Sequence, residues 1–97
     1  MPITDGIKTL SKIKDRAWFI FVYNKRQYTI FTNNYKYMLF DMGYSFVNSY
    51  PLSPILYKQK YTYYEFENNH ILHFFKDMFP ELESDLEKQL LKLKLCQ

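Results

Sequence analysis

Residues 17–32, with the sequence AWFIFVYNKRQYTIFT, decide how the rest of the chain can fold. Two runs rich in aromatic and β-branched residues flank the polar tetrapeptide Asn24-Lys25-Arg26-Gln27. Such runs suit a pleated, half-buried surface, and a short polar connection between them is typical of a β-hairpin. The pattern therefore predicts two antiparallel strands with this tetrapeptide as their connection.

The segments on either side of the hairpin have spacings typical of short helices. Residues 4–14 place three aliphatic side chains near one helical face. Residues 35–42 follow two asparagines that could cap a helix, and they precede Gly43, a residue type that often ends helices in the left-handed conformation. We therefore expect one helix before the hairpin and another, of about two turns, after it.

The middle of the chain is harder to assign. Residues 44–50 fit an extended segment, and two prolines then interrupt regular structure. Residues 55–66, ILYKQKYTYYEF, have no cleanly apolar face when they are written as a strand. We expect either one long edge strand or a second hairpin with its turn near Lys58 and Gln59.

Two helices are predicted at the C-terminal end. Asn68 or Asn69 can cap a helix that runs through Phe79 and carries a wide apolar stripe. Pro80 suits the first position of the next helix, in which acidic residues come early and lysines come late, as the helix macrodipole favours.

These elements predict an α+β protein. Its small antiparallel sheet of two hairpins would pack against helices, in the approximate order αββαββαα, with two helices at the C-terminus. The sequence contains no flexible linker, and a chain of 97 residues is too short to divide its core between two units. We therefore expect residues 1–97 to form a single globular domain.

The composition bounds the setting of the protein. A single cysteine, Cys96, cannot form an internal disulfide, and no signal-peptide or membrane-spanning pattern is visible, so we expect a cytoplasmic protein. The many Phe, Tyr, Asn, Ile and Lys residues indicate an AT-rich genome, which is compatible with a phage or a mobile element. The chain has twenty aromatic side chains, ten of them Tyr, and these can fill a core and also serve recognition.

A basic and aromatic set of residues is a candidate for nucleic-acid binding, because cations can track phosphates while flat rings stack on bases. The alternative is that Tyr packs well in strands and Lys protects turns and edges from pairing. The set comprises Tyr23, Lys25, Arg26, Tyr28, Lys36, Lys58, Lys60 and Tyr61.

A second candidate is a metal site formed by Glu67, His70, His73 and Asp77, whose spacings of three and four place them on neighbouring turns of one helix. The alternative is that these side chains form the solvated face of that helix. Because no matching ligand pair occurs elsewhere in the chain, we expect neither a metal nor another cofactor.

A third candidate is a leucine stripe near the C-terminus, which could bind a partner protein or a second copy of the chain. The alternative is that the stripe packs into the core of its own domain. Its members are Leu82, Leu86, Leu90, Leu91, Leu93 and Leu95.

Catalytic fingerprints are missing from the sequence. It contains no glycine-rich phosphate loop and no nucleophile elbow, and its only cysteine is the penultimate residue. The leading hypothesis is a small non-enzymatic interaction protein, an inhibitor or accessory subunit, that binds a protein partner through Tyr-rich and Leu-rich surfaces. The second hypothesis is a protein that binds single-stranded or duplex nucleic acid.

Overall fold

The computed structural model describes residues 5–13, 16–33, 36–44, 54–67 and 70–95. Five strands form one antiparallel sheet whose spatial order is the order of the chain. They are β1 (Gly6–Ile13), β2 (Arg16–Tyr23), β3 (Arg26–Asn33), β4 (Lys36–Gly43) and β5 (Thr62–Glu67). Helix α1 (Pro54–Lys60) comes between β4 and β5, while α2 (His70–Met78) and α3 (Glu83–Leu95) follow β5. The predicted α+β class, the antiparallel sheet and the two C-terminal helices are confirmed.

The predicted hairpin is formed by β2 and β3, with a tighter turn than the sequence indicated. Tyr23 pairs with Arg26, so only Asn24 and Lys25 lie in the turn. Both turn residues have positive φ values, 52° and 66°, which is the backbone geometry of a type I′ turn. The backbone N–H of Asn24 also donates to Asp5 Oδ1 at 2.9 Å, which ties the turn to the residue that precedes β1.

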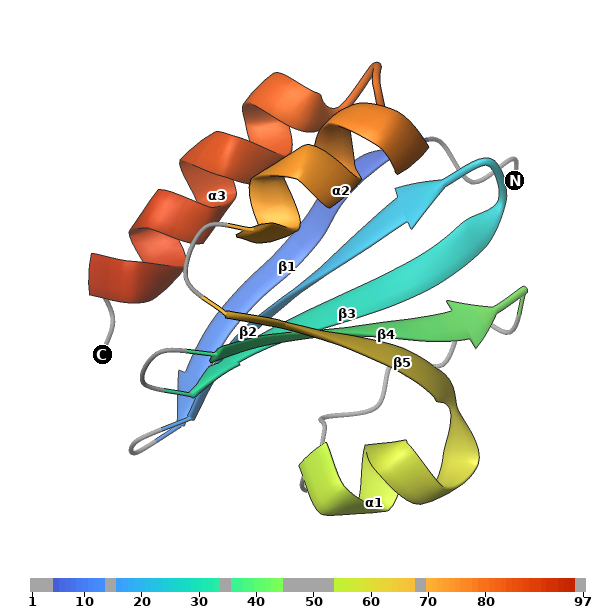
Figure 1. The fold of residues 1–97 in the computed structure, drawn as a ribbon, viewed down its shortest axis with the longest axis vertical. Coiled ribbons are helices and arrows are strands. Elements are labelled where there is room, and N and C mark those ends of the chain that lie inside the picture. The colour runs from blue at the N-terminus through green and yellow to red at the C-terminus, as the bar shows by residue number, and fades with distance from the viewer. Residues whose placement is uncertain (1–4, 14–15, 34–35, 45–53, 68–69, 96–97) are drawn as a thin grey trace.

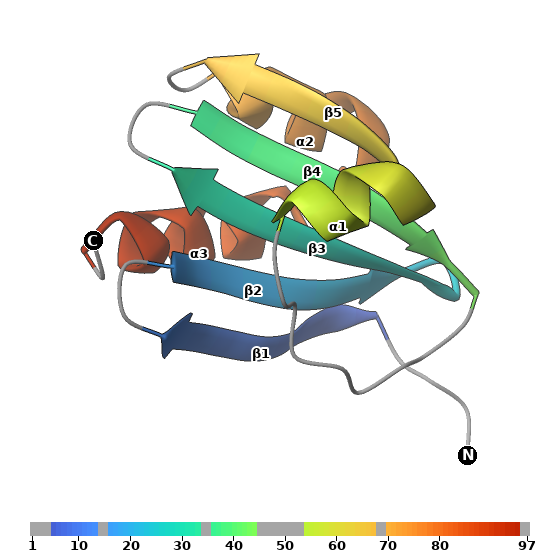
Figure 2. The same cartoon turned by 90° about the horizontal axis from the view of Figure 1, so that it is seen from below.

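Helices cover both faces of the sheet. Figure 1 shows α2 and α3 on one face and α1 on the other, and Figure 2 shows α1 in front of β3 and β4. Alternate residues of each strand therefore enter two different cores. In β2, Phe19 and Phe21 belong to the cluster that packs against α2 and α3, whereas Trp18 belongs to the cluster that includes Tyr57 of α1.

The helices expected at residues 4–14 and 35–42 are corrected by the structure, which places strands β1 and β4 in these segments. In β4, Tyr37 and Leu39 pack toward α2 and α3, while Met38 and Phe40 pack on the opposite face. A strand that is buried on both faces loses the alternation of polar and apolar residues. Its continuous apolar run then satisfies helical spacing equally well.

The segment from residue 55 to residue 66 contains α1 and β5 and not a second hairpin. The expected turn near Lys58 and Gln59 is wrong, because both residues lie inside α1. The expectation of an edge strand is confirmed for β5, which pairs only with β4 and ends the sheet. Of the extended segment expected at residues 44–50, residues 45–50 lie outside the described part of the chain.

The C-terminal helices begin close to where the sequence predicted them, except that Pro80 lies in the turn between α2 and α3 and does not start α3. Backbone hydrogen bonds from Leu82 to Phe79 (2.9 Å) and from Leu86 to Leu82 (2.8 Å) carry the chain through this turn. The complete order of elements is ββββαβαα in place of αββαββαα. Among the described residues, no helix is long and apolar enough to cross a membrane.

Candidate functional site

Helix α1 is held on the sheet by one aromatic side chain. Tyr57 is 8% exposed, and its ring meets those of Phe31 and Phe40 edge-on, with centroids 5.5 and 5.4 Å away. Tyr61 adds a further edge-on contact with Tyr57 at 5.3 Å. This anchor uses one side of a seven-residue helix, and residues 55, 56, 58, 59 and 60 of α1 are exposed.

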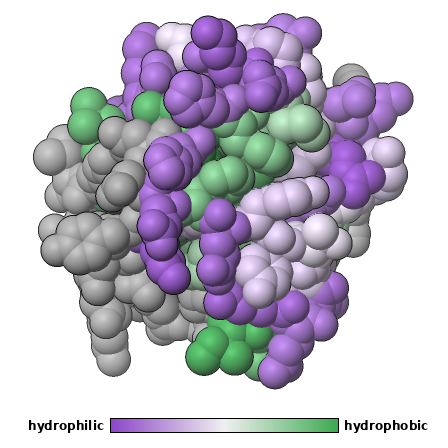
Figure 3. All heavy atoms as spheres, in the orientation of Figure 1, coloured by the Kyte–Doolittle hydropathy of each residue, from purple (hydrophilic) through white to green (hydrophobic). Residues whose placement is uncertain are grey.

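Apolar side chains are exposed along α1 and the start of β5. Ile55 is 67% exposed, Leu56 is 48% exposed and Tyr63 is 37% exposed. Figure 3 shows a hydrophobic group at the lower edge of the molecule, in the region that α1 occupies in Figure 1. We call this region the α1–β5 surface; it consists of Ile55, Leu56, Lys58, Lys60, Tyr61 and Tyr63.

The two lysines of this surface lie against aromatic rings and an acid. Lys58 Nζ is 2.8 Å from Glu65 Oε1 and 5.3 Å from the centre of the Tyr63 ring. Lys60 Nζ is 5.4 Å from the centre of the Tyr61 ring. The hydrogen bond between Lys58 and Glu65 raises the pKa of the lysine and lowers the pKa of the glutamate. The polar contacts therefore order side chains around the exposed apolar residues.

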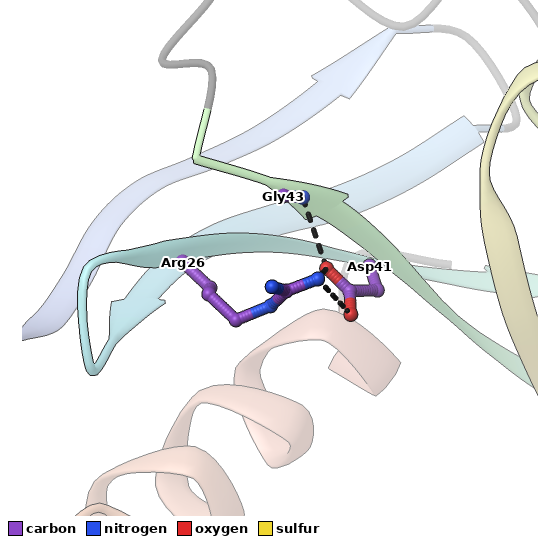
Figure 4. A network of polar contacts seen from close by, with 3 residues as sticks. All are labelled: Arg26, Asp41 and Gly43. Carbon is purple, nitrogen blue, oxygen red and sulfur yellow. Dashed lines mark hydrogen bonds and ion pairs between the residues drawn. The ribbon is translucent and has the colours of Figure 1, made fainter.

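A separate polar network lies at the end of the β3–β4 pair (Figure 4). Arg26 Nη2 donates to both carboxylate oxygens of Asp41, at 2.9 and 2.8 Å, and the backbone N–H of Gly43 donates to Asp41 Oδ1 at 2.9 Å. The guanidinium of Arg26 also lies 4.8 Å from the centre of the Tyr44 ring. The hydrogen bond to Asp41 is the main cause that raises the pKa of Arg26. The register of β3 and β4 shifts beside this network, so Arg26 has a structural role there.

The tyrosines near this network are also used by the fold. The ring of Tyr28 stacks on Phe21 at 5.1 Å and meets Phe79 edge-on at 4.9 Å, and burial raises the pKa of its hydroxyl. The hydroxyl of Tyr23 donates to Glu81 Oε2 at 2.5 Å, a hydrogen bond that raises the pKa of Tyr23. Both side chains thus connect the β2–β3 hairpin to the segment that joins α2 and α3.

The eight residues proposed for nucleic-acid binding do not form one surface. Lys25 lies in the turn at one end of the sheet, and Lys36 lies at the start of β4, opposite Asn33 at the other end. An eight-residue strand separates these ends by about 25 Å. Lys58 and Lys60 lie on α1, and only they share a region with Tyr61. The second hairpin, one of the two alternatives for residues 55–66, is not formed, so it does not bring Lys58, Lys60 and Tyr61 beside the β2–β3 turn.

The proposed metal ligands are also divided by the structure. Glu67 belongs to β5, so it is not on the helix that carries His70, His73 and Asp77. All four side chains are exposed. Among the described residues, no group of three or more His, Cys, Asp or Glu side chains is arranged to hold a metal ion.

Most of the leucine stripe belongs to the core of its own domain. Leu82, Leu86, Leu90 and Leu93 are at most 8% exposed and pack with the buried aromatic residues of β2 and α2, so a partner has no access to them in this fold. Leu91 is 60% exposed. The side chain of Leu95 lies outside the described part of the structure.

Sequence reasoning missed Ile55 and Leu56 as surface residues because it treated this segment as a strand. Pro54 is a signal that could have located them, since proline is favoured at the first position of a helix. The lysines at positions 58 and 60 then suit the C-terminal turn of that helix.

Comparison of the chain with protein-family models, with curated proteins and with solved structures gave no match. The geometry of the described residues is therefore the basis for the functional argument that follows.

Proposed function

We propose that this chain is a small non-enzymatic interaction protein that binds a partner protein through the α1–β5 surface. The observation that carries the proposal is the exposure of Ile55 and Leu56 on α1 together with that of Tyr63 on β5. Exposed apolar patches mark sites of protein interaction, and tyrosine is enriched among the residues that contribute most to binding. An inhibitor or an accessory subunit would need no more than such a surface.

The chemistry of this surface specifies the kind of partner. Ile55 and Leu56 need an apolar depression to be removed from water, and Tyr63 adds a flat ring whose hydroxyl can remain at the rim. Lys60 follows Leu56 by four residues, one turn along α1, and would favour a carboxylate at the border of the depression. We therefore expect a folded partner with an apolar pocket bordered by acidic residues.

A protein partner fits this surface better than nucleic acid does. The ammonium of Lys58 already contacts Glu65, whose carboxylate would repel a phosphate backbone. Arg26 is likewise paired with Asp41, and Lys36 lies at the far end of the sheet. Isoleucine and leucine offer no stacking platform for a base, whereas they bury well against another protein.

Site-specific photocross-linking can identify the partner and test the surface together. Benzoylphenylalanine placed at Leu56 should cross-link a defined protein in extract from the source organism. The same group at Leu91, an exposed leucine on the opposite face of the sheet, should not cross-link that protein. A cross-link formed only from Leu91 would contradict the proposal and would favour α3 as the binding face.

Binding between purified components then measures the contribution of the surface. Leu56→Asp should weaken binding of the cross-linked protein by about tenfold or more, because it places a charge in an apolar pocket. Leu91→Asp is the matched control and should change the affinity by less than about twofold. Equal losses for the two variants would count against the α1–β5 surface. Retardation of a labelled oligonucleotide that weakens steeply with salt would favour the nucleic-acid hypothesis.

A further inference from the structure

The two outer strands of the sheet differ in how they present their edges. The pairing of β1 with β2 contains a register shift between Ile7 and Thr9, and Gly6 has a φ of +128°. Such irregularity commonly protects an edge from pairing with another strand. The pairing of β5 with β4 runs through six consecutive residue pairs without a shift. The regular backbone of β5 is therefore a suitable template for a further strand.

The outer side of β5 is open within the described part of the chain. β5 is the last strand of the sheet, and Figure 2 shows no described strand beside its outer edge. No residue of β5 is buried, and Tyr63 and Tyr64 are 37% and 45% exposed. Because an edge strand carries backbone N–H and C=O groups without strand partners on its outer side, these groups can bind another extended segment.

We propose that β5 pairs antiparallel with β5 of a second copy of this chain, about a twofold axis at Tyr64 and perpendicular to the sheet. Such an axis keeps each face of the sheet on the same side in both copies. The two five-stranded sheets would then join into one continuous sheet. In this register Tyr64 faces Tyr64 of the second copy, and Tyr63 faces Glu65 of the second copy.

Charge disfavours the registers that are shifted toward the C-terminal end of β5. An axis at Glu65 would place two glutamates directly opposite each other, and an axis at Phe66 would place Glu65 opposite Glu67. The axis at Tyr64 avoids both repulsions. It also brings Glu65 of the second copy toward Lys58, because Lys58 already lies over the Tyr63 ring that this glutamate would face.

Aromatic contacts on the helical face support the same register. The Tyr64 ring lies 5.2 Å from Phe74 of α2, and Phe74 lies 5.1 Å from Phe66. Across the twofold axis, the two Tyr64 rings would join these groups into one cluster and bury the exposed part of each ring. Because only a few residues pair on each side, we expect reversible association with a Kd in the micromolar to millimolar range.

The dimer can be tested separately from the proposed protein partner, because Ile55 and Leu56 lie on α1 and not on the pairing strand. In this arrangement both α1–β5 surfaces lie on the same face of the joined sheet, so a dimer would present two of them. A monomer that still binds its partner through Leu56 would overturn the dimer and leave the proposed function intact. A dimer that cross-links no partner would support the strand pairing and overturn the proposed function.

Sedimentation velocity of the full chain from about 1 µM to about 1 mM should show an increase from the monomer to the dimer mass. Tyr64→Lys should abolish this increase, because it places two like charges opposite each other at the axis. Leu91→Lys adds the same charge on another exposed surface and should leave the association unchanged. Circular dichroism should verify that both variants are folded.

A mixing experiment tests the register directly. Tyr64→Lys and Tyr64→Glu should each be monomeric, whereas an equimolar mixture should form a heterodimer, since residue 64 faces only itself across the axis. Restored association in the mixture would support the proposal. A wild-type protein that remains monomeric throughout, a Tyr64→Lys variant that still dimerises, or a mixture that stays monomeric would overturn it.

Discussion

The hairpin β2–β3 and the outer strand β5 belong to one sheet but bury very different parts of their side chains. Phe19, Phe21 and Ile30 are fully removed from solvent, and Trp18 and Phe31 are nearly so on the opposite face. In β5, five of six residues are exposed and Phe66 is half-buried. The hairpin therefore carries stability on both faces, whereas β5 contributes little to either core and is available for binding.

This contrast separates two uses of aromatic residues in the chain. In the hairpin, rings such as Phe21 and Tyr28 stack on each other and meet Phe79 edge-on. In β5, the ring of Tyr63 lies under the ammonium group of Lys58 and remains partly exposed to water. A high aromatic content thus indicates a large core first, and only the exposed minority can serve recognition.

The largest expected effect is on the hairpin itself. Phe21→Ala removes a fully buried ring whose centroid lies 5.1 Å from those of both Tyr28 and Phe79. The free energy of unfolding, measured by urea denaturation, should fall by about 3–5 kcal/mol. The control Tyr63→Ala in β5 should cost about 1 kcal/mol or less, because that ring is partly exposed. Similar losses of unfolding free energy in the two variants would contradict the difference between the β2–β3 hairpin and β5.

A smaller effect of opposite sign is expected at the hairpin turn. Lys25 has a φ of 66°, in the left-handed region that disfavours residues with a Cβ atom. Lys25→Gly should raise the free energy of unfolding by about 0.5–1 kcal/mol, since Asn-Gly is the preferred type I′ turn sequence. Lys36→Gly at the start of β4 should instead lower it, because a strand position gains nothing from glycine. Destabilisation by Lys25→Gly would show that the side chain itself stabilises the turn.

The smallest effect concerns the ion pair of Lys58 and Glu65. The hydrogen bond from Lys58 lowers the pKa of Glu65, so the pair stabilises the folded state above the ordinary pKa of glutamate. That contribution is lost as the pH falls through the lowered pKa of the folded protein. Lys58→Met should raise the pKa of Glu65 in a carboxyl-carbon NMR titration, while Lys92→Met on α3 should not change it. An unaltered Glu65 titration in Lys58→Met would mean that the ion pair does not form in solution.

The parts of the fold that the sequence predicted are those with a single dominant pattern. The β2–β3 hairpin has two aromatic and β-branched runs around a short polar connection, and α2 and α3 have caps and apolar stripes; all three elements occur. Strands β1 and β4 were read as helices because their hydrophobic spacing also fits a helix, and only pairing with neighbouring strands decides between the two. Propensity alone carries no information about that pairing.

The candidate sites were less predictable than the fold because they depend on which residues the fold brings together. Lys60 and Tyr61 were named from the sequence and do meet in the α1–β5 surface. Arg26 was named as well, but its partner Asp41 becomes a neighbour only through the pairing of β3 with β4. Four leucines of the stripe were candidates for a partner and proved to be core, since exposure cannot be read from spacing alone.

The connection lengths in this sheet have a consequence for the order in which it assembles. The turn between β2 and β3 holds only Asn24 and Lys25, whereas residues 44–61 separate β4 from β5. Closing a longer loop costs more chain entropy, and contacts between distant residues form more slowly. We therefore expect the central strands to fold as the nucleus and β5 to dock late. The strand with the open edge would then also be among the first to exchange its amide hydrogens.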